Sequence, residues 1–178
     1  MRFALLLCLS FGIVPLVSAQ VLVAPKAGLN VSTWSGSDSN DPDVKLGFVG
    51  GVSLQVPMEP VSVVVEALYS QKGIERGGQT LAFDYAELAL LGRLAIPTNS
   101  ALEVGVGIGP WVGIPVSTDL DALTDFGLAL GLDVGSGPFY VEARYDLGLT
   151  DIPDTVADLD IQNQSVALTG GYRIVFGG

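Results

Sequence analysis

The chain alternates apolar residues with small or charged ones through eight separate stretches, and this period of two excludes a helical fold for most of its length. The pattern is plainest at residues 125–136. Every second position from Phe126 to Val134 is apolar there, with glycine, alanine or aspartate between. A strand sends such residues to opposite faces, whereas a helix would mix them. We therefore predict strands at residues 22–34, 44–57, 60–73, 81–96, 101–115, 125–136, 138–149 and 164–176.

The connections between these stretches alternate in length. The short ones are rich in turn-forming residues and cover 58–60, 97–100 and 136–138. The long ones cover 35–43, 71–80, 117–124 and 150–163. An even number of strands places all the short turns at one end and all the long connections at the other, as in outer-membrane barrels. The fold class that we predict is all-β, an eight-stranded antiparallel up-and-down transmembrane β-barrel.

Residues 1–19 differ in composition from the rest. Arg2 precedes an almost wholly apolar run from Phe3 to Val17, and Ser18 and Ala19 supply the small residues that signal peptidase needs. We predict a cleavable signal peptide at 1–19 and a single barrel domain at 20–178. The alternative is a membrane anchor, but the apolar run is shorter than the roughly 20 residues that span a bilayer as a helix.

The chain has few residues suited to catalysis. Its one cysteine, Cys8, lies in the leader and follows Leu7 where a lipoprotein signal needs a small residue, and it has no histidine. The mature chain therefore lacks thiol chemistry, disulfides and the usual general base. Glu87 and Glu103 remain as a candidate carboxylate pair, but they would lie in a packed lumen without a substrate cleft. We expect no enzyme activity and no cofactor.

The small-residue faces of the strands carry charges of both signs. They are Lys26, Glu66, Glu87, Arg93, Glu103, Asp133, Glu142, Arg144 and Arg173. Turned outward at mid-membrane, an Arg or Lys would cost roughly 2–4 kcal/mol. Turned inward, the two signs can pair across the lumen. Such a network is either a structural plug or a path for protons or ions, and we favour the plug because side chains fill an eight-stranded interior. Trp111, on the same faces, would also fill lumen space.

A soluble barrel of the lipocalin type would alternate too, but its polar face would be rich in Lys, Glu, Thr and Gln. Here that face is mostly Gly, Ala and Ser, and the mean hydropathy of the chain is +0.51. These features favour an apolar face that meets lipid and a small-residue face that lines the lumen. A soluble periplasmic carrier of small ligands is the weaker alternative.

Acidic residues gather in and beside the long connections. The net charge of −11 argues against nucleic acid or anionic headgroups as partners. Ten of the 19 acids lie there: Asp38, Asp41, Asp43, Asp119, Asp121, Asp125, Asp151, Asp154, Asp158 and Asp160. The oxygen ligands of Asp38, Asn40, Asp41 and Asp43 form a weak candidate site for a divalent cation. The alternatives are a solvated acidic rim, which we favour, and an adaptation to a saline habitat.

Three short motifs carry a resemblance to a known family. They are Lys-Ala-Gly-Leu-Asn at 26–30, Leu-Tyr-Ser-Gln-Lys-Gly at 68–73 and Phe-Asp-Tyr-Ala-Glu at 83–87. With them the mature chain resembles the small outer-membrane β-barrel proteins of Gram-negative bacteria, of the porin-family or PorT-like kind. The resemblance implies outer-membrane residence, with lipid and the barrel assembly machinery as partners. Gly171, Ile174 and Phe176 look like the assembly signal in the last strand, although Gly177 and Gly178 follow it.

Two functional hypotheses follow. In the first, the protein is a non-enzymatic outer-membrane scaffold with a plugged lumen, whose acidic external loops contact lipopolysaccharide, divalent ions or a partner. In the second, it is an accessory subunit of an envelope secretion or assembly machine. The sequence does not name the ligand, the protein partner or the oligomeric state.

Overall fold

The computed structural model of the chain describes residues 20–35, 45–58, 60–76, 79–116, 124–150 and 162–177. Within the strands, only the backbone is described at 33–35, 73–76, 79–83 and 162–163. No helix in these ranges is long and apolar enough to cross a membrane. The strands are β1 (Val21–Ser35), β2 (Lys45–Met58), β3 (Val61–Arg76), β4 (Gln79–Ile96), β5 (Leu102–Pro115), β6 (Asp125–Ser136), β7 (Phe139–Gly148), β8 (Gln162–Tyr172) and β9 (Ile174–Phe176).

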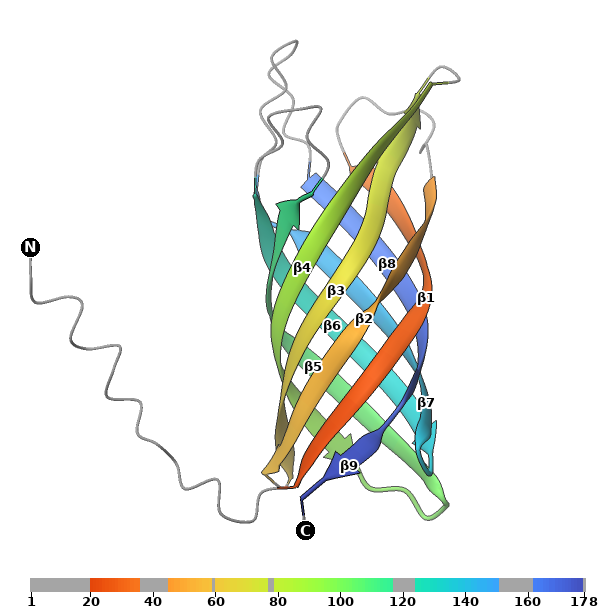
Figure 1. The fold of residues 1–178 in the computed structure, drawn as a ribbon, viewed down its shortest axis with the longest axis vertical. Coiled ribbons are helices and arrows are strands. Elements are labelled where there is room, and N and C mark those ends of the chain that lie inside the picture. The colour runs from red at the N-terminus through yellow and green to blue at the C-terminus, as the bar shows by residue number, and fades with distance from the viewer. Residues whose placement is uncertain are drawn as a thin grey trace, which may run out of the picture.

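Each strand from β1 to β7 pairs antiparallel with the next, and β1 also pairs with β8, which closes the sheet into a barrel (Figure 1). The short β9 continues the register of β8 along β1, because Lys26 is opposite Gly171 and Val23 is opposite Ile174. The two segments therefore form one wall strand, and the barrel has eight. The predicted strand 164–176 is interrupted only at Arg173, where the backbone N–H donates to the Pro138 carbonyl at 2.7 Å, beyond the start of β7. The predicted fold class is confirmed.

One end of the barrel carries the β2–β3, β4–β5 and β6–β7 connections, together with the start of β1 and the end of β9 (Figure 1). We call it the short-turn end. At the β4–β5 turn, the Thr98 hydroxyl donates to the Leu102 carbonyl, and the Leu102 N–H donates to Ser100 Oγ at 3.2 Å. Gly137 adopts a φ of 57° in the β6–β7 turn, a conformation that glycine adopts without strain. We call the opposite end the loop end.

One predicted long connection, residues 71–80, is wrong. β3 and β4 pair as far as Arg76 and Gln79, so the two strands continue as a ribbon at the loop end (Figure 1). The paired strands satisfy each other's backbone hydrogen bonds, which lets them extend beyond their other neighbours. Gly77-Gly78, the two residues between them in the sequence, are typical of a two-residue hairpin turn. The predicted signal peptide at 1–19 and most of the connections 35–43, 117–124 and 150–163 lie outside the described residues.

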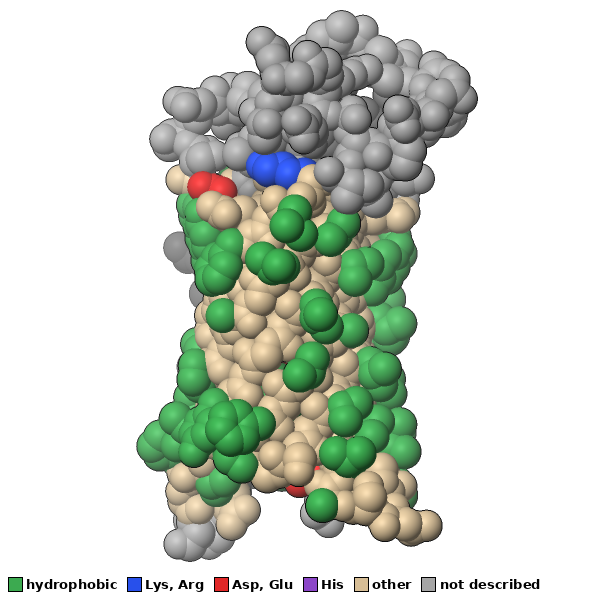
Figure 2. All heavy atoms as spheres, turned by 90° about the vertical axis from the view of Figure 1, so that its right-hand side faces the viewer, with side chains coloured by type: hydrophobic (Ala, Val, Ile, Leu, Met, Phe, Trp, Pro, Cys, Tyr) green, Lys and Arg blue, Asp and Glu red, His purple; other side chains and the backbone are tan. Residues whose placement is uncertain are grey.

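The two faces of the strands are sorted as predicted. Leu130 on β6 is 47% exposed, whereas its neighbour Ala129 is fully buried in the lumen. Figure 2 shows apolar side chains spread over the outer wall, with backbone and other side chains between them, while Lys, Arg, Asp and Glu appear in that view only near its two ends. A surface this apolar is costly in water and favourable in hydrocarbon. The barrel wall is therefore built to lie in a lipid bilayer.

Candidate functional site in the barrel lumen

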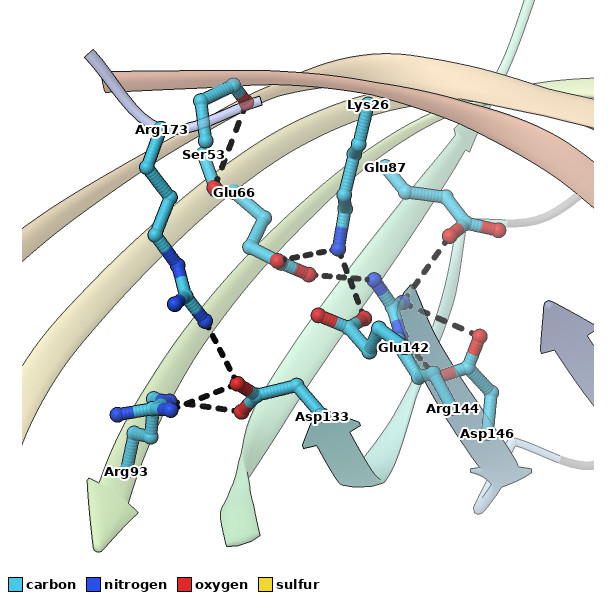
Figure 3. A network of polar contacts seen from close by, with 11 residues as sticks. Lys26, Ser53, Glu66, Glu87, Arg93, Asp133, Glu142, Arg144, Asp146 and Arg173 are labelled. Carbon is cyan, nitrogen blue, oxygen red and sulfur yellow. Dashed lines mark hydrogen bonds and ion pairs between the residues drawn. The ribbon is translucent and has the colours of Figure 1, made fainter. Parts of the chain in front are cut away.

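The lumen is filled by ion pairs, and Arg144 of β7 is the hub of the larger group (Figure 3). Its Nη1 lies 2.9 Å from Glu66 Oε2, its Nη2 3.1 Å from Glu87 Oε2, and its Nε 2.6 Å from Asp146 Oδ1. The three carboxylates come from β3, β4 and β7. One guanidinium, with five donors in a fixed fork, therefore ties three separate strands together inside the barrel.

Lys26 of β1 extends this group toward the short-turn end. Its ammonium lies 2.5 Å from Glu66 Oε1 and 2.8 Å from Glu142 Oε1. Glu66, which is only 1% exposed, therefore binds Lys26 with one oxygen and Arg144 with the other. A charge buried to this degree is tolerated only when it is paired, and each oxygen of Glu66 has a cation.

Lys72 of β3 extends the same group toward the loop end. Its Nζ lies 2.6 Å from Glu87 Oε1, and 4.3 Å from the centre of the Trp111 ring. Trp111 is 3% exposed and fills lumen space, as predicted from its place on the small-residue face. The ammonium is therefore held by a carboxylate and by the face of an indole ring, which attracts a cation through its quadrupole. We call Lys26, Glu66, Lys72, Glu87, Glu142, Arg144 and Asp146 the upper cluster.

A second, smaller group lies toward the short-turn end. Arg93 holds Asp133 with two bonds, Nε to Oδ2 at 2.7 Å and Nη2 to Oδ1 at 2.6 Å. Arg173 donates to Asp133 Oδ1 at 2.7 Å and to Glu103 Oε2 at 2.9 Å. We call these four residues the lower cluster. Glu103 is its exposed member, with 66% of its side chain open to solvent at the barrel mouth.

Glycines on the inward faces make room for these side chains. A β-carbon at Gly105 would overlap the Arg93 guanidinium, and one at Gly171 would overlap the ring of Tyr140. By contrast, a β-carbon at Gly131 would meet no heavy atom within 4 Å. Some of the inward glycines are therefore required by the space that a charged or aromatic neighbour needs, which explains why small and charged residues share one face.

All nine charges predicted to face the lumen lie in one of the two clusters. Two further members, Lys72 and Asp146, were not predicted. Lys72 lies where the predicted strand 60–73 overlaps the predicted connection 71–80. Both follow the parity of their neighbours, since Lys72 continues the inward series of Glu66, Leu68 and Ser70.

Asp125 requires a correction. It was counted among the acids of the external rim, but it is 3% exposed and begins the inward series of β6. The other residues of the predicted rim and the candidate cation ligands Asp38, Asn40, Asp41 and Asp43 lie outside the described residues. Within the described ranges, no group of three or more Cys, Asp or Glu side chains is arranged to hold a metal ion.

Glu87 and Glu103 are not brought together. Glu87 is opposite Gly113 near the loop end of β5, whereas Glu103 lies at the short-turn start of that strand. Each carboxylate is paired with cations of its own cluster. The arrangement therefore does not form the carboxylate pair considered for acid–base chemistry.

The residues of the predicted assembly signal lie along the closing seam. Gly171 packs beside Tyr140 in the lumen, and Ile174 and Phe176 of β9 are exposed on the outside of the barrel. On the neighbouring strands, the rings of Phe139 and Tyr172 meet edge to face with 5.1 Å between their centres. Aromatic side chains near the ends of barrel strands are typical of a membrane interface. Recognition of these residues by the barrel assembly machinery stays a prediction.

Comparisons with known proteins identify the fold of the chain. No protein-family model and no curated protein matches the chain. Among solved structures, Neisserial surface protein A is similar with a TM-score of 0.57 and 13% identity, covering 86% of this chain and 97% of that one. Ail, the attachment invasion locus protein of Yersinia pestis, is similar with a TM-score of 0.50 and 14% identity, covering 89% and 100%. The likeness is not to PorT-like proteins in particular. The chain has the fold of the small eight-stranded outer-membrane β-barrels, with an outer wall of the kind that lies in lipid.

Proposed function

We propose that the protein is a non-catalytic outer-membrane scaffold and surface-contact protein, whose external loops meet other molecules. The observation that carries this proposal is the network of ion pairs in the lumen. Ion pairs cross the barrel interior, and the two cavities beside them measure only about 40 and 10 Å³. Pockets for small organic ligands are on the order of 300–1,000 Å³. Recognition is therefore assigned to the outside of the barrel rather than to its interior.

In this proposal, the short-turn end faces the periplasm and the loop end faces the exterior. The barrel assembly machinery inserts the chain and reads Gly171, Ile174 and Phe176. The acidic residues of the long connections contact a divalent cation, lipopolysaccharide or a partner protein. One structure of similar fold is called a surface protein and the other an attachment invasion locus protein. We extend only the idea of surface contact to this chain.

Two measurements test the proposal. Purified protein in planar bilayers is expected to give no stable conductance, and proteases added to intact cells are expected to cut only within the long connections. Stable channels would contradict the plugged lumen. Cleavage at 97–100 or 136–138 would show that the barrel has the opposite orientation in the membrane.

A third measurement separates this proposal from its alternatives. Extraction in mild detergent is expected to release the protein without a stoichiometric partner. Recovery of a stable complex would instead favour an accessory subunit of an envelope machine. Recovery of soluble protein without detergent would favour a periplasmic carrier and would overturn membrane residence.

A further inference from the structure

The first wall strand begins one residue after the predicted cleavage site. Gln20 is exposed and directly precedes Val21, where β1 starts. Val21 pairs with Phe176 of β9, and Leu22 pairs with Gln55 of β2. The start of β1 and the end of β9 therefore lie side by side at the short-turn end (Figure 1). Cleavage before Gln20 would leave a glutamine as the amino-terminal residue, directly outside the closing seam of the barrel.

We propose that Gln20 is a modification site, at which the α-amino group released by cleavage and the glutamine side chain close to a pyroglutamate ring. The mature barrel then begins with a neutral lactam instead of an ammonium group. Ring closure depends on the predicted cleavage before Gln20, and it does not depend on the role proposed for the external loops.

The ring closes without an oxidant, a reductant or a cofactor. The lone pair of the neutral α-amine attacks the side-chain carbonyl carbon, Cδ, and a bond from the α-nitrogen to Cδ forms. The bond from Cδ to Nε2 breaks, and the side-chain nitrogen leaves as ammonia with a proton from the attacking amine. Ordinary α-amino groups titrate near about pH 8, so roughly a tenth of them are neutral at pH 7. The nucleophile is therefore present at ordinary pH, and the product is a five-membered lactam.

The place of Gln20 in the fold leaves its two reacting groups free to meet. The residue precedes the first pair of the β1 ladder and is exposed, so its amide is not packed inside the barrel. The ring contains no atom of Val21, so the pairing of Val21 with Phe176 is unaffected. The modification is therefore compatible with the closed barrel.

The lactam would protect the start of the seam. Aminopeptidases bind the free α-ammonium group of their substrate, and a lactam does not supply one. Val21, Leu22 and Val23 are the residues that pair β1 with β9, and the ends of a chain open more readily than its middle. A blocked terminus therefore keeps aminopeptidases from shortening this part of the seam residue by residue.

Mass spectrometry of the amino-terminal peptide tests the modification. Acetic anhydride is added to the cell envelope before extraction, because it acetylates a free terminal amine, leaves a lactam unchanged and prevents ring closure during handling. Trypsin does not cut at acetylated lysine, so the first tryptic peptide of the unfolded protein is 20–76. Its mass is expected to fall short of the encoded peptide by one ammonia, with acetyl groups only on Lys26, Lys45 and Lys72.

The other possible masses separate the two steps. A peptide that begins at Gln20 and carries an acetyl group on its terminus would confirm the cleavage and overturn the ring closure. A peptide that begins at another residue, or that retains residues of the segment 1–19, would overturn both. None of these outcomes bears on the contacts proposed for the external loops.

Gln20→Asn is the matched control. It keeps a side-chain amide at the same exposed position but is one methylene shorter, so the corresponding ring would have four members and be strongly strained. The variant is expected to fold, as judged by heat-modifiable migration on a gel, because residue 20 lies outside the paired residues. Its terminus is expected to be acetylated. A variant terminus that escapes acetylation as the wild type does would show a different blocking group and would overturn the proposal.

A second readout tests the protection of the seam. The folded wild-type barrel in detergent micelles, incubated with a broad-specificity aminopeptidase, is expected to keep its full mass. The Gln20→Asn variant is expected to lose residue 20 under the same conditions. Loss of residue 20 from the wild type, or equal resistance of the two proteins, would overturn protection by the lactam.

Discussion

Arg144 and Glu66 stand on β7 and β3, on opposite walls of the barrel, and their side chains meet at 2.9 Å in its centre. In the strand order, three strands separate β7 from β3 in either direction around the wall. A side-chain contact across that diameter means that the charged groups themselves occupy the axis. Paired charges therefore occupy the centre of the barrel, while its outer wall supplies the apolar surface for lipid.

Arg144→Leu is expected to destabilise the barrel by about 3–5 kcal/mol, because it leaves Glu66, Glu87 and Asp146 without their shared cation. Urea unfolding in lipid vesicles, followed by intrinsic tryptophan fluorescence, measures the change. The double variant with Glu66→Gln is the control. It is expected to lose less than the sum of the two single variants, and strict additivity would show that the pair contributes no coupling.

Val106→Arg is expected to impair assembly, because Val106 lies on the outward face of β5 and an outward Arg at mid-membrane costs about 2–4 kcal/mol. Heat-modifiable migration after refolding reports the folded fraction. Leu102→Arg is the depth control, since Leu102 starts the same strand on the same face at the short-turn end, where the cost falls to about 0–1 kcal/mol. Equal behaviour of the two variants would mean that the wall does not lie in hydrocarbon.

Gly171→Ala is expected to destabilise the barrel by about 1–3 kcal/mol, because the added β-carbon overlaps the Tyr140 ring and the packed interior has to shift. Gly131→Ala is the matched control on another inward face. Its β-carbon meets open space, so it is expected to be neutral or slightly stabilising. Urea unfolding of both variants under one condition measures the difference, and an unstable Gly131→Ala would show that inward glycines are needed for reasons other than space.

Lys72 and Trp111 are expected to be coupled by roughly 2 kcal/mol, the value for a cation–π contact removed from water. A double-mutant cycle with Lys72→Met and Trp111→Leu measures the coupling free energy of unfolding. Glu87 loses one cation in every variant that removes Lys72, so the cycle cancels that loss. A coupling near zero would show that the Trp111 ring does not stabilise the Lys72 ammonium.

Much of the fold was predictable because a strand in a membrane barrel has one face toward lipid and the other toward the lumen. The β6 series from Phe126 to Val134 could be assigned to a face by parity alone, and Ala129 and Leu130 lie where parity places them. The interior charges were predictable for the same reason, since Lys26 and Arg144 have no acceptable place in hydrocarbon. The predicted loop at 71–80 is wrong because alternation continues through Lys72 and the two strands stay paired as far as Arg76 and Gln79.

The sequence by itself determined the faces, the strand count and the inward position of the charges, because each of these follows from the period of two and from the cost of charge in lipid. The tertiary structure alone decided which charges meet. The contacts depend on the register between strands and on the curvature that brings opposite walls within reach. Examples are the ion pairs of Arg144 with Glu66 and of Arg93 with Asp133, and the separation of Glu87 from Glu103. Those are properties of the closed barrel, and no local pattern in a strand encodes the distance to a side chain on the opposite wall.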